Sequence, residues 1–394
     1  MTLIACATLA GHKSIEAISE WCNAASQEIL ERLGARIAPG SGLRIAPSYA
    51  TIRRTLLAVD ADEFDRIVNT WAAQQATTRT SRPQPAAPAT TSAAEPPTLD
   101  DSDHDDDNHR ASGGSTSAGE VGGRLVGVAV DGKTLRGAKR SDGTQVQLLA
   151  ALRHDLGMVI GQANVENDKT NEILAFAPLI KPLELAGMVV TADAMHTQRA
   201  AATLLKSKAA DYIFGVKKNQ PNLFNAGIDI LKAININQPE FETSQRGHGR
   251  IDRHRLWTAQ VPTTTTFPHA ARYVIVERES STLADERTSI EYRIYITSLT
   301  ATDADTANLH RLINGHWSIE NSLHWVRDVT YDEDRSQVRT GTTPRVLATL
   351  RNLAISIIRC TTNRTTNIAA ATRQLARQPN LTLDLLGIPQ RLCT

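Results

Sequence analysis

Between residues 125 and 216, apolar runs and turn signals follow one another in an order that few folds can accommodate. Residues 125–130, 146–152 and 158–165 are rich in β-branched and other apolar side chains, which is typical of strands. Residues 171–185 and 197–209 have the apolar spacing of helices, and residues 188–191 and 212–216 again resemble strands. The predicted order is therefore β-β-β-α-β-α-β.

This order predicts an α/β domain with a mixed five-stranded sheet and flanking helices. A meander of three strands is followed by two crossovers, and such crossovers are right-handed in nearly all proteins. The same order is found in the ribonuclease H-like fold. We expect this domain to extend from residue 124 to about residue 365, with residues 366–394 as a C-terminal tail.

The segments before residue 124 differ in composition from this domain. Residues 1–73 predict a small all-α domain, in which Ser48 and Asp60 can each cap a helix. The helix after Ser48 carries Arg53 and Arg54 and is a candidate DNA-recognition helix; the alternative is a helical bundle that does not contact DNA. Residues 74–123 are rich in Ala, Thr and Pro, then in acids, then in Gly and Ser, so we expect a disordered linker. Its acidic run is expected to be solvated, with metal binding as the alternative.

Charge is unevenly distributed along the chain of 394 residues, although its net value is only +1. Seven acids and no Lys or Arg lie between residues 95 and 107, whereas nine arginines and one acid follow from Arg335 onward. A basic C-terminal part suits a polyanionic partner, and a solvated helical face explains it equally well. No stretch reaches the roughly 18 apolar residues of a membrane span. The four scattered cysteines are typical of a reducing cytosol and argue against a structural zinc site.

Two acids follow predicted strands of the sheet. Asp131 comes directly after the first strand and Asp193 after the fourth. If these strands are neighbours, both carboxylates lie at one end of the sheet, where they can bind the divalent ions that assist phosphoryl transfer. Taken singly, Asp131 reads as a turn residue and Asp193 as a helix N-cap; taken together they favour a metal site.

A third acid, Glu320, lies on a predicted helix beside the apolar stripe of Ile319, Leu323 and Val326. His316 and His324 are one turn away on either side. Basic residues along such a helix can position a DNA backbone while the acid binds metal. The spacing His316-x3-Glu320-x3-His324 also permits zinc as an alternative.

Several motifs, in this combination and order, resemble one family over nearly the whole chain. They are VAVDGKTLRG around Asp131, KTNEI from Lys169, VVTADAMHTQ around Asp193, DYIFGVKKNQ from Asp211, HGR from His248, HWSIENSLHW around Glu320 and DVTYDEDRS from Asp328. The sequence resembles the ISAs-type insertion-sequence transposases, also called H-repeat-associated proteins. They belong to the DDE transposases that carry a β-rich insertion before the catalytic Glu.

The resemblance implies Asp131, Asp193 and Glu320 as catalytic, metal-binding residues, with two Mg²⁺ or Mn²⁺ ions as cofactors. A strand-rich insertion at about residues 222–298, including 273–277 and 292–296, accounts for the long gap between Asp193 and Glu320. Ile313, His316, Glu320 and Arg327 occupy the places of the wider group's Tyr-x2-Arg-x3-Glu-x6-Lys signature. The expected DNA contacts are Lys133, Arg136, Gln198, Lys217, Lys218, Asn219, Gln220, Arg250, His316 and Arg327, with Arg253 and Arg255 nearby in the insertion.

The resemblance also implies a function and partners. We expect cleavage of insertion-sequence ends and strand transfer to target DNA by in-line attack, without a covalent enzyme intermediate. The expected partners are double-stranded DNA and a second copy of the chain, in the bacterial cytoplasm at the nucleoid. Relatives carry more sequence before this N-terminus, which suggests a truncated copy. Two alternatives follow: a catalytically decayed or domesticated DNA-binding protein, and a ribonuclease H-like nuclease without strand transfer.

Overall fold

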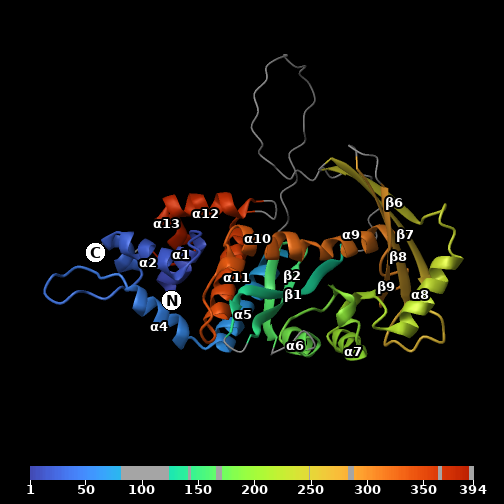
Figure 1. Cartoon of the computed structure of the whole chain (residues 1–394), viewed down its shortest axis with the longest axis horizontal. Helices are drawn as coiled ribbons and strands as arrows, with labels where there is room; N and C mark the ends of the chain where they lie inside the picture. Colours follow the sequence, from blue (N-terminus) through green and yellow to red (C-terminus); the bar gives the residue numbers. More distant parts are fainter. Residues whose placement is uncertain are drawn as a thin grey trace, which may run out of the picture.

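A computed structural model describes residues 1–80, 124–140, 143–165, 171–247, 249–282, 288–362 and 366–389. The predicted linker falls outside these ranges except for residues 74–80, which are helical and continue α5 rather than beginning a linker. Figure 1 shows helices from both ends of the chain on one side, a sheet in the centre and a long β-ribbon on the other side. Within the described ranges, no helix is both long and apolar enough to cross a membrane.

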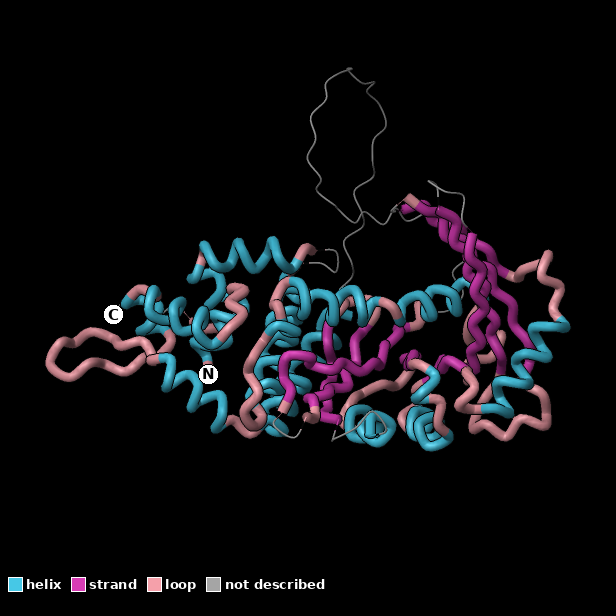
Figure 2. The backbone as a smooth tube through the Cα atoms, in the orientation of Figure 1, coloured by secondary structure: helices cyan, strands magenta, loops and turns pink. Residues whose placement is uncertain are grey.

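The described strands form a single sheet of nine strands in the order β3-β2-β1-β4-β5-β9-β8-β7-β6. Figure 2 shows these strands running from the centre of the molecule into the ribbon. The bounds are β1 Val126–Lys139, β2 Gln145–Arg153, β3 Met158–Val165, β4 Met188–Ala192, β5 Asp211–Val216, β6 Phe241–Gly247, β7 Arg250–Gln260, β8 Arg272–Thr282 and β9 Thr288–Thr297.

The predicted number of five strands is wrong for the sheet as a whole. The first five strands occur as predicted, with β1 parallel to β4 and β4 parallel to β5. The predicted β-rich insertion does not form a separate sheet, because β9 pairs antiparallel with β5 from Ile213↔Thr297 to Val216↔Ile294. A sequence pattern identifies strands but not the edge at which an inserted ribbon joins, so the extended sheet was not foreseen.

The two faces of the sheet are covered by different helices (Figure 1). Val128 and Val130 of β1 face a core shared with α6 and α7. Ala129 between them points the opposite way, into a core with Ile319, Leu323 and α11. Side chains alternate along a strand, so Asp131 shares the face of Ala129. The helices around the sheet are α6 Asn171–Ile180, α7 Arg199–Ser207, α8 Pro221–Ala233, α9 Thr306–His316, α10 Trp325–Val329 and α11 Thr343–Thr361.

The two ends of the described chain pack together in a helical region. The N-terminal helices share a core with Val346, Leu347 and Leu350 of α11 and with Leu383. Ser48 and Asp60 cap α4 and α5 as predicted, since Ser48 Oγ accepts from Thr51 N and Asp60 Oδ1 from the amides of residues 62 and 63. The predicted C-terminal tail thus contains two packed helices. This region comprises α1 Thr2–Leu9, α2 Ile15–Ala24, α3 Gln27–Arg32, α4 Tyr49–Ala58, α5 Ala61–Thr80, α12 Ile368–Arg377 and α13 Pro379–Leu385.

Candidate active site

The parallel ladder between β1 and β4 brings two of the three predicted acids together. Its last pair is Val130↔Ala192, so Asp131 and Asp193 are the next residues of the two strands. β1 does not end before Asp131 as predicted, but continues to Lys139 while paired with β2. β4 ends at Ala192, and the chain turns into the short 3-10 helix η1 (Ala194–His196). The end of β4 therefore leaves room for both carboxylates at the edge of a shared cavity.

Glu320 reaches this end of the sheet from an irregular helical segment. It begins a π-helical turn, η2 (Glu320–His324), between α9 and α10. The predicted stripe holds this turn on the sheet, because Ile319, Leu323 and Val326 are at most 4% exposed and pack against Ala129, Ala150 and Leu152. π-helical turns are rare and are frequently found at functional sites.

His324 connects Glu320 with Asp131. Its Nδ1 lies 3.0 Å from Glu320 Oε2 and 3.7 Å from Asp131 Oδ2. One ligand atom from each of these three residues lies within 4.8 Å of the others, which is close enough for all three to share one metal ion. The sequence pattern placed His324 one helical turn from Glu320 and indicated it as a ligand only in the zinc alternative, not together with Asp131.

His316 approaches the other acid. Its Nε2 lies 3.8 Å from Asp193 Oδ1, and its Nδ1 lies 3.1 Å from Thr191 Oγ1. His316 therefore contacts Asp193, whereas His324 contacts Asp131 and Glu320. Among the described residues, the group close enough to hold a metal ion is Asp131, Glu320 and His324. The zinc alternative of His316, Glu320 and His324 does not form, because Asp131 takes the place of His316.

Burial and the histidines act in opposite directions on these carboxylates. Burial raises the pKa of Asp131, while the nearby His324 and His316 lower it. The hydrogen bond from His324 lowers the pKa of Glu320 despite partial burial. Burial lowers the pKa of His316. A divalent cation fits this donor set, since carboxylate oxygens are the ligands that Mg²⁺ and Mn²⁺ prefer and the cation relieves the mutual repulsion of the acids.

A cavity of about 700 Å³ opens beside Asp131 and Asp193. The exposed residues Lys217 and Lys218 lie along it. Glu172 and His196 also line this cavity, and Glu172 Oε1 lies 3.1 Å from His196 Nε2. This pair was not predicted from the sequence. The cavity therefore combines acids at its end with basic side chains at its rim, an arrangement suited to a polyanion.

Three predicted polar contacts bind the backbone next to Asp193. Gln198 Nε2 donates to Met195 O at 3.0 Å. Asn219 Nδ2 donates to Ala194 O and Gln220 Nε2 to Thr197 O, each at 2.7 Å. These amides brace the turn that follows Asp193, so in this structure they orient the site.

The predicted basic DNA contacts divide into exposed and buried groups. Arg136 is 81% exposed and Arg250 is 48% exposed, although each has an acidic neighbour, Asp334 and Asp252. Lys133 is 9% exposed and its Nζ lies 2.5 Å from Asp328 Oδ2, so reaching a phosphate requires breaking that ion pair. The structure contradicts the prediction for Arg327, whose guanidinium is 0% exposed and pairs with Glu333. The spacing from Glu320 predicted a basic side chain at position 327, but it could not predict that this side chain points into the protein interior.

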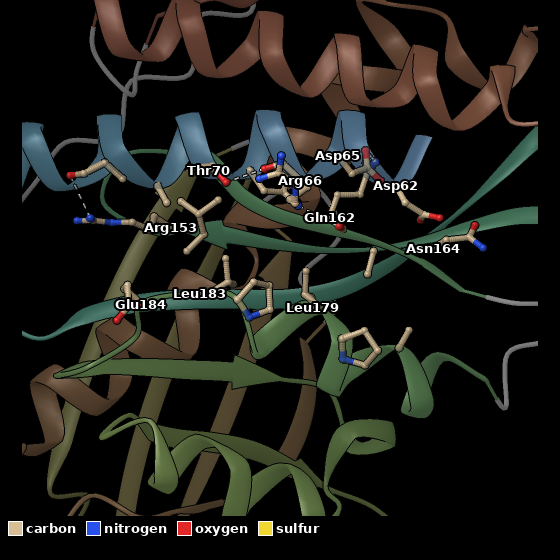
Figure 3. A pocket seen from close by; sticks show the side chains of 18 of the residues that line it. Asp62, Asp65, Arg66, Thr70, Arg153, Gln162, Asn164, Leu179, Leu183 and Glu184 are labelled. Carbon is tan, nitrogen blue, oxygen red and sulfur yellow. Dashed lines mark hydrogen bonds between the residues drawn. The ribbon is translucent and has the colours of Figure 1, made fainter. Parts of the chain in front are cut away.

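A larger cavity, of about 850 Å³, lies away from the acids, between α5, β3 and α6. Figure 3 shows Arg66 and Thr70 on α5 across from Leu179 near the end of α6 and Leu183 just after it, with Gln162 of β3 between them. None of the three predicted catalytic acids lines it. Size alone therefore does not identify the active site here.

A cluster of acids at the end of parallel strands, with cations beside it, defines a candidate metal-dependent site for a polyanionic substrate. The comparison with protein families agrees with this class. The model described as "Transposase DDE domain" matches residues 122–357, and the one described as "DDE_Tnp_1-associated" matches residues 1–72. The chain belongs to the DDE transposase family.

Relatives from Escherichia coli have related names. "Putative transposase YncI" of strain O157:H7 is 30% identical over 243 residues, which cover 59% of this chain and 61% of that protein. "H repeat-associated putative transposase YhhI" of strain K12 is 31% identical over 245 residues, covering 59% and 63%. The match thus spans about three fifths of each relative's length. A cryo-EM structure of a piggyBac transposase synaptic complex with hairpin DNA matches 68% of this chain and 54% of the piggyBac chain, with 10% sequence identity and a TM-score of 0.37. A TM-score this low does not establish a shared fold.

Proposed function

We propose that this chain is a DNA transposase that cuts the ends of an insertion sequence and joins them to target DNA, with Asp131, Asp193 and Glu320 as its catalytic acids. The observation that carries the proposal is the register Val130↔Ala192, which makes Asp131 and Asp193 the next residues of two adjacent parallel strands. Glu320 belongs to the same site through His324, which contacts both Glu320 and Asp131.

The three acids act as metal ligands in this proposal. Two divalent ions, Mg²⁺ or Mn²⁺, supply activation of the attacking oxygen and charge stabilisation of the leaving oxygen when they are bound. His324 orients the Glu320 carboxylate by donating to Oε2. Lys217 and Lys218 attract the phosphate backbone towards the cavity, and the amides of Gln198, Asn219 and Gln220 keep the turn after Asp193 in place.

We further propose a ribonuclease H-like catalytic domain at 124–365 and an associated helical domain that extends past the predicted end at residue 73 to the end of α5 at residue 80. The order β3-β2-β1-β4-β5, with β6–β9 as the insertion, supports the first assignment. The family-model match to residues 1–72 and the exposed Arg53 and Arg54 on α4 support a DNA-binding role for the second. We propose a homodimer as the active species, because strand transfer requires two DNA ends to be held together.

A cleavage and strand-transfer assay tests the proposal. Purified protein is mixed with supercoiled plasmid carrying the DNA that flanks the gene, with Mg²⁺ or Mn²⁺, beside Asp193→Asn. Asp229→Asn serves as the matched control, because Asp229 is 76% exposed on α8 and does not line the cavity. We expect end-specific 3′-OH products joined to target DNA from the wild type and the control, and none from Asp193→Asn despite equal DNA binding.

Other outcomes separate the alternatives. Binding of the ends without any product identifies a catalytically decayed or domesticated DNA-binding protein. Cleavage without joining identifies a nuclease of the same fold. Equal activity of Asp193→Asn and wild type removes Asp193 from the catalytic set and overturns the proposed mechanism.

A further inference from the structure

A chain of polar contacts leads from the turn after β2 to Asp193. It begins at His154, which is 4% exposed. His154 Nε2 lies 3.3 Å from Thr191 Oγ1, and the same hydroxyl lies 3.1 Å from Nδ1 of His316. The other ring nitrogen of His316 is the one that faces Asp193 Oδ1 at 3.8 Å. Three side chains on three separate segments are thereby joined to a candidate catalytic acid.

Two glycines make room for the His154 ring. A Cβ atom built on Gly127 of β1 would lie 2.1 Å from His154 Nδ1, and one built on Gly315 of α9 would lie 2.3 Å from the same atom. Glycine within a helix costs about 1 kcal/mol relative to alanine. Any side chain at either position would displace the imidazole, so the backbones of β1 and α9 close directly around it.

The donors and acceptors in this series of polar contacts follow from which atoms can carry a hydrogen. At 3.8 Å the Asp193 carboxylate is beyond hydrogen-bond distance of His316 Nε2, but its negative charge favours the neutral tautomer with the proton on Nε2. Nδ1 of His316 is then an acceptor, and the Thr191 hydroxyl donates to it. The hydroxyl has a single proton and a second acceptor within reach, Val128 O at 3.5 Å, but His316 Nδ1 is nearer at 3.1 Å. With the proton directed at His316 Nδ1, His154 Nε2 donates to the Thr191 oxygen. In this tautomer the donors run from His154 through Thr191 to His316.

We propose that His154 is a positioning residue: through Thr191 it fixes the His316 ring so that Nε2–H points at Asp193. The same contacts hold α9, which leads into Glu320, against β1 and β4, whose ends carry Asp131 and Asp193. His154 thus sets the spacing between the acid supplied by the helix and the acids supplied by the strands. The consequences for catalysis and for metal affinity rest on the proposed function, whereas the contacts and the orientation of the His316 ring do not.

Paired variants separate this role from packing. Thr191→Val keeps the shape and removes the hydroxyl, and Thr191→Ser keeps the hydroxyl. His154→Leu removes the ring donor, and His154→Gln retains an N–H donor. The first readout is the ring ¹⁵N spectrum of full-length, metal-free protein labelled at histidine, with the His316 signals assigned from a His316→Gln sample.

We expect wild type, Thr191→Ser and His154→Gln to show His316 with Nε2 protonated and with the Nδ1 shift of a hydrogen-bonded acceptor. In Thr191→Val the Nδ1 signal should move to the position of an unbonded ring nitrogen, and in His154→Leu the Nε2–H signal should broaden as the ring reorients. Unchanged His316 signals in both Thr191→Val and His154→Leu would overturn the proposal.

The second readout is the affinity for Mn²⁺, titrated without DNA. Removing an outer hydrogen bond that orients a metal ligand typically costs 10–100-fold in metal affinity. We therefore expect at least about a tenfold weakening in Thr191→Val and His154→Leu and near-wild-type affinity in the two conservative variants. Equal weakening in Thr191→Ser and Thr191→Val would assign the effect to packing and reject the positioning role. Absence of DNA cleavage in every form would reject only the proposed function, because both readouts are made without DNA.

Discussion

Arg327 and Glu333 form an ion pair in the interior of the protein, with Arg327 Nη2 2.7 Å from Glu333 Oε2 and neither side chain more than 1% exposed. Arg351 of α11 pairs with the other carboxylate oxygen, also at 2.7 Å. The two guanidinium groups lower the pKa of Glu333 against the effect of its burial. One carboxylate therefore joins the helix after Glu320 to α11.

Removal of one member of this cluster leaves a buried charge without its partner. Such changes typically destabilise by about 3–5 kcal/mol, so we expect Arg327→Met to lower the unfolding free energy by that amount, as measured by urea denaturation. Arg335→Met, at an 85% exposed site paired with Asp332 at 3.7 Å, should change it by less than about 0.5 kcal/mol. If Arg327→Met instead weakened DNA binding and left stability unchanged, the buried assignment of Arg327 would be contradicted.

Gly315 provides a test of the packing around His154. Gly315→Ala places a methyl group 2.3 Å from His154 Nδ1, and overpacking of this kind typically costs about 1–3 kcal/mol. In the double variant with His154→Ala the methyl group has space, so the two changes should couple favourably by at least about 1 kcal/mol in a double-mutant cycle. Strict additivity would show that the ring moves away at no cost. Gly247→Ala is the control, because a Cβ atom there would meet nothing within 4 Å. Gly143→Ala is unsuitable, because the φ of +86° at Gly143 adds backbone strain.

His324 is expected to influence metal binding through Glu320. His324→Ala removes the donor 3.0 Å from Glu320 Oε2 and a neighbour 3.7 Å from Asp131 Oδ2. We expect Mn²⁺ affinity to fall by about 10–100-fold, while the affinity for DNA in the absence of metal is unchanged. Isothermal titration with Mn²⁺ and a gel-shift assay in EDTA measure the two quantities. A His324→Ala protein that binds Mn²⁺ as tightly as wild type would remove this histidine from the site.

Lys217 and Lys218 are expected to act on DNA as charges rather than as readers of sequence. Removing one basic side chain that neutralises a phosphate reduces the slope of log affinity against log salt by about one. The variant Lys217→Ala/Lys218→Ala should therefore bind specific and nonspecific DNA more weakly by a similar factor and show a slope smaller by about two. Lys232→Ala, 72% exposed at the end of α8, is the control for a general change in charge. An unchanged salt slope would place the DNA elsewhere on the protein.

The sequence predicted what depends on local pattern and on the pairing of neighbouring strands. The β-branched run at residues 125–130 and the order of the following elements predicted that Asp131 and Asp193 share one end of the sheet if the first and fourth strands are neighbours. The structure pairs these two strands, β1 and β4. Glu320 was found through its helical stripe. The sequence did not predict that β9 would pair with β5, since that pairing joins residues about 80 positions apart. Nor did it predict that Arg327 would turn towards Glu333, because helical spacing gives the face of a side chain and not its partner.

The last prediction concerns pH and a pair of histidines remote from the acids. His310 is 7% exposed, and its Nε2 lies 3.0 Å from His254 Nδ1 and 2.9 Å from Asn314 Nδ2. Burial, together with His254, lowers the pKa of His310 from 6.5 to about 4. The unfolded chain binds a proton more readily than the folded one, so the contribution to stability is complete above pH 6.5 and declines as the pH falls towards 4.

At about 1.4 kcal/mol per pKa unit, this shift lowers the unfolding free energy by about 2 kcal/mol between pH 7.5 and pH 5. His310→Gln keeps a polar side chain that does not titrate, so its stability should fall less over the same interval. Urea denaturation of wild type and His310→Gln at the two pH values measures the difference in unfolding free energy. The titration of carboxylates elsewhere cancels in this comparison, because both proteins contain the same carboxylates. An equal loss in wild type and His310→Gln would mean that the buried imidazole accepts its proton as easily as it does in the unfolded chain. The hydrogen-bond partners of His310 among the described residues argue against that outcome, because they are a histidine and an asparagine rather than an acid.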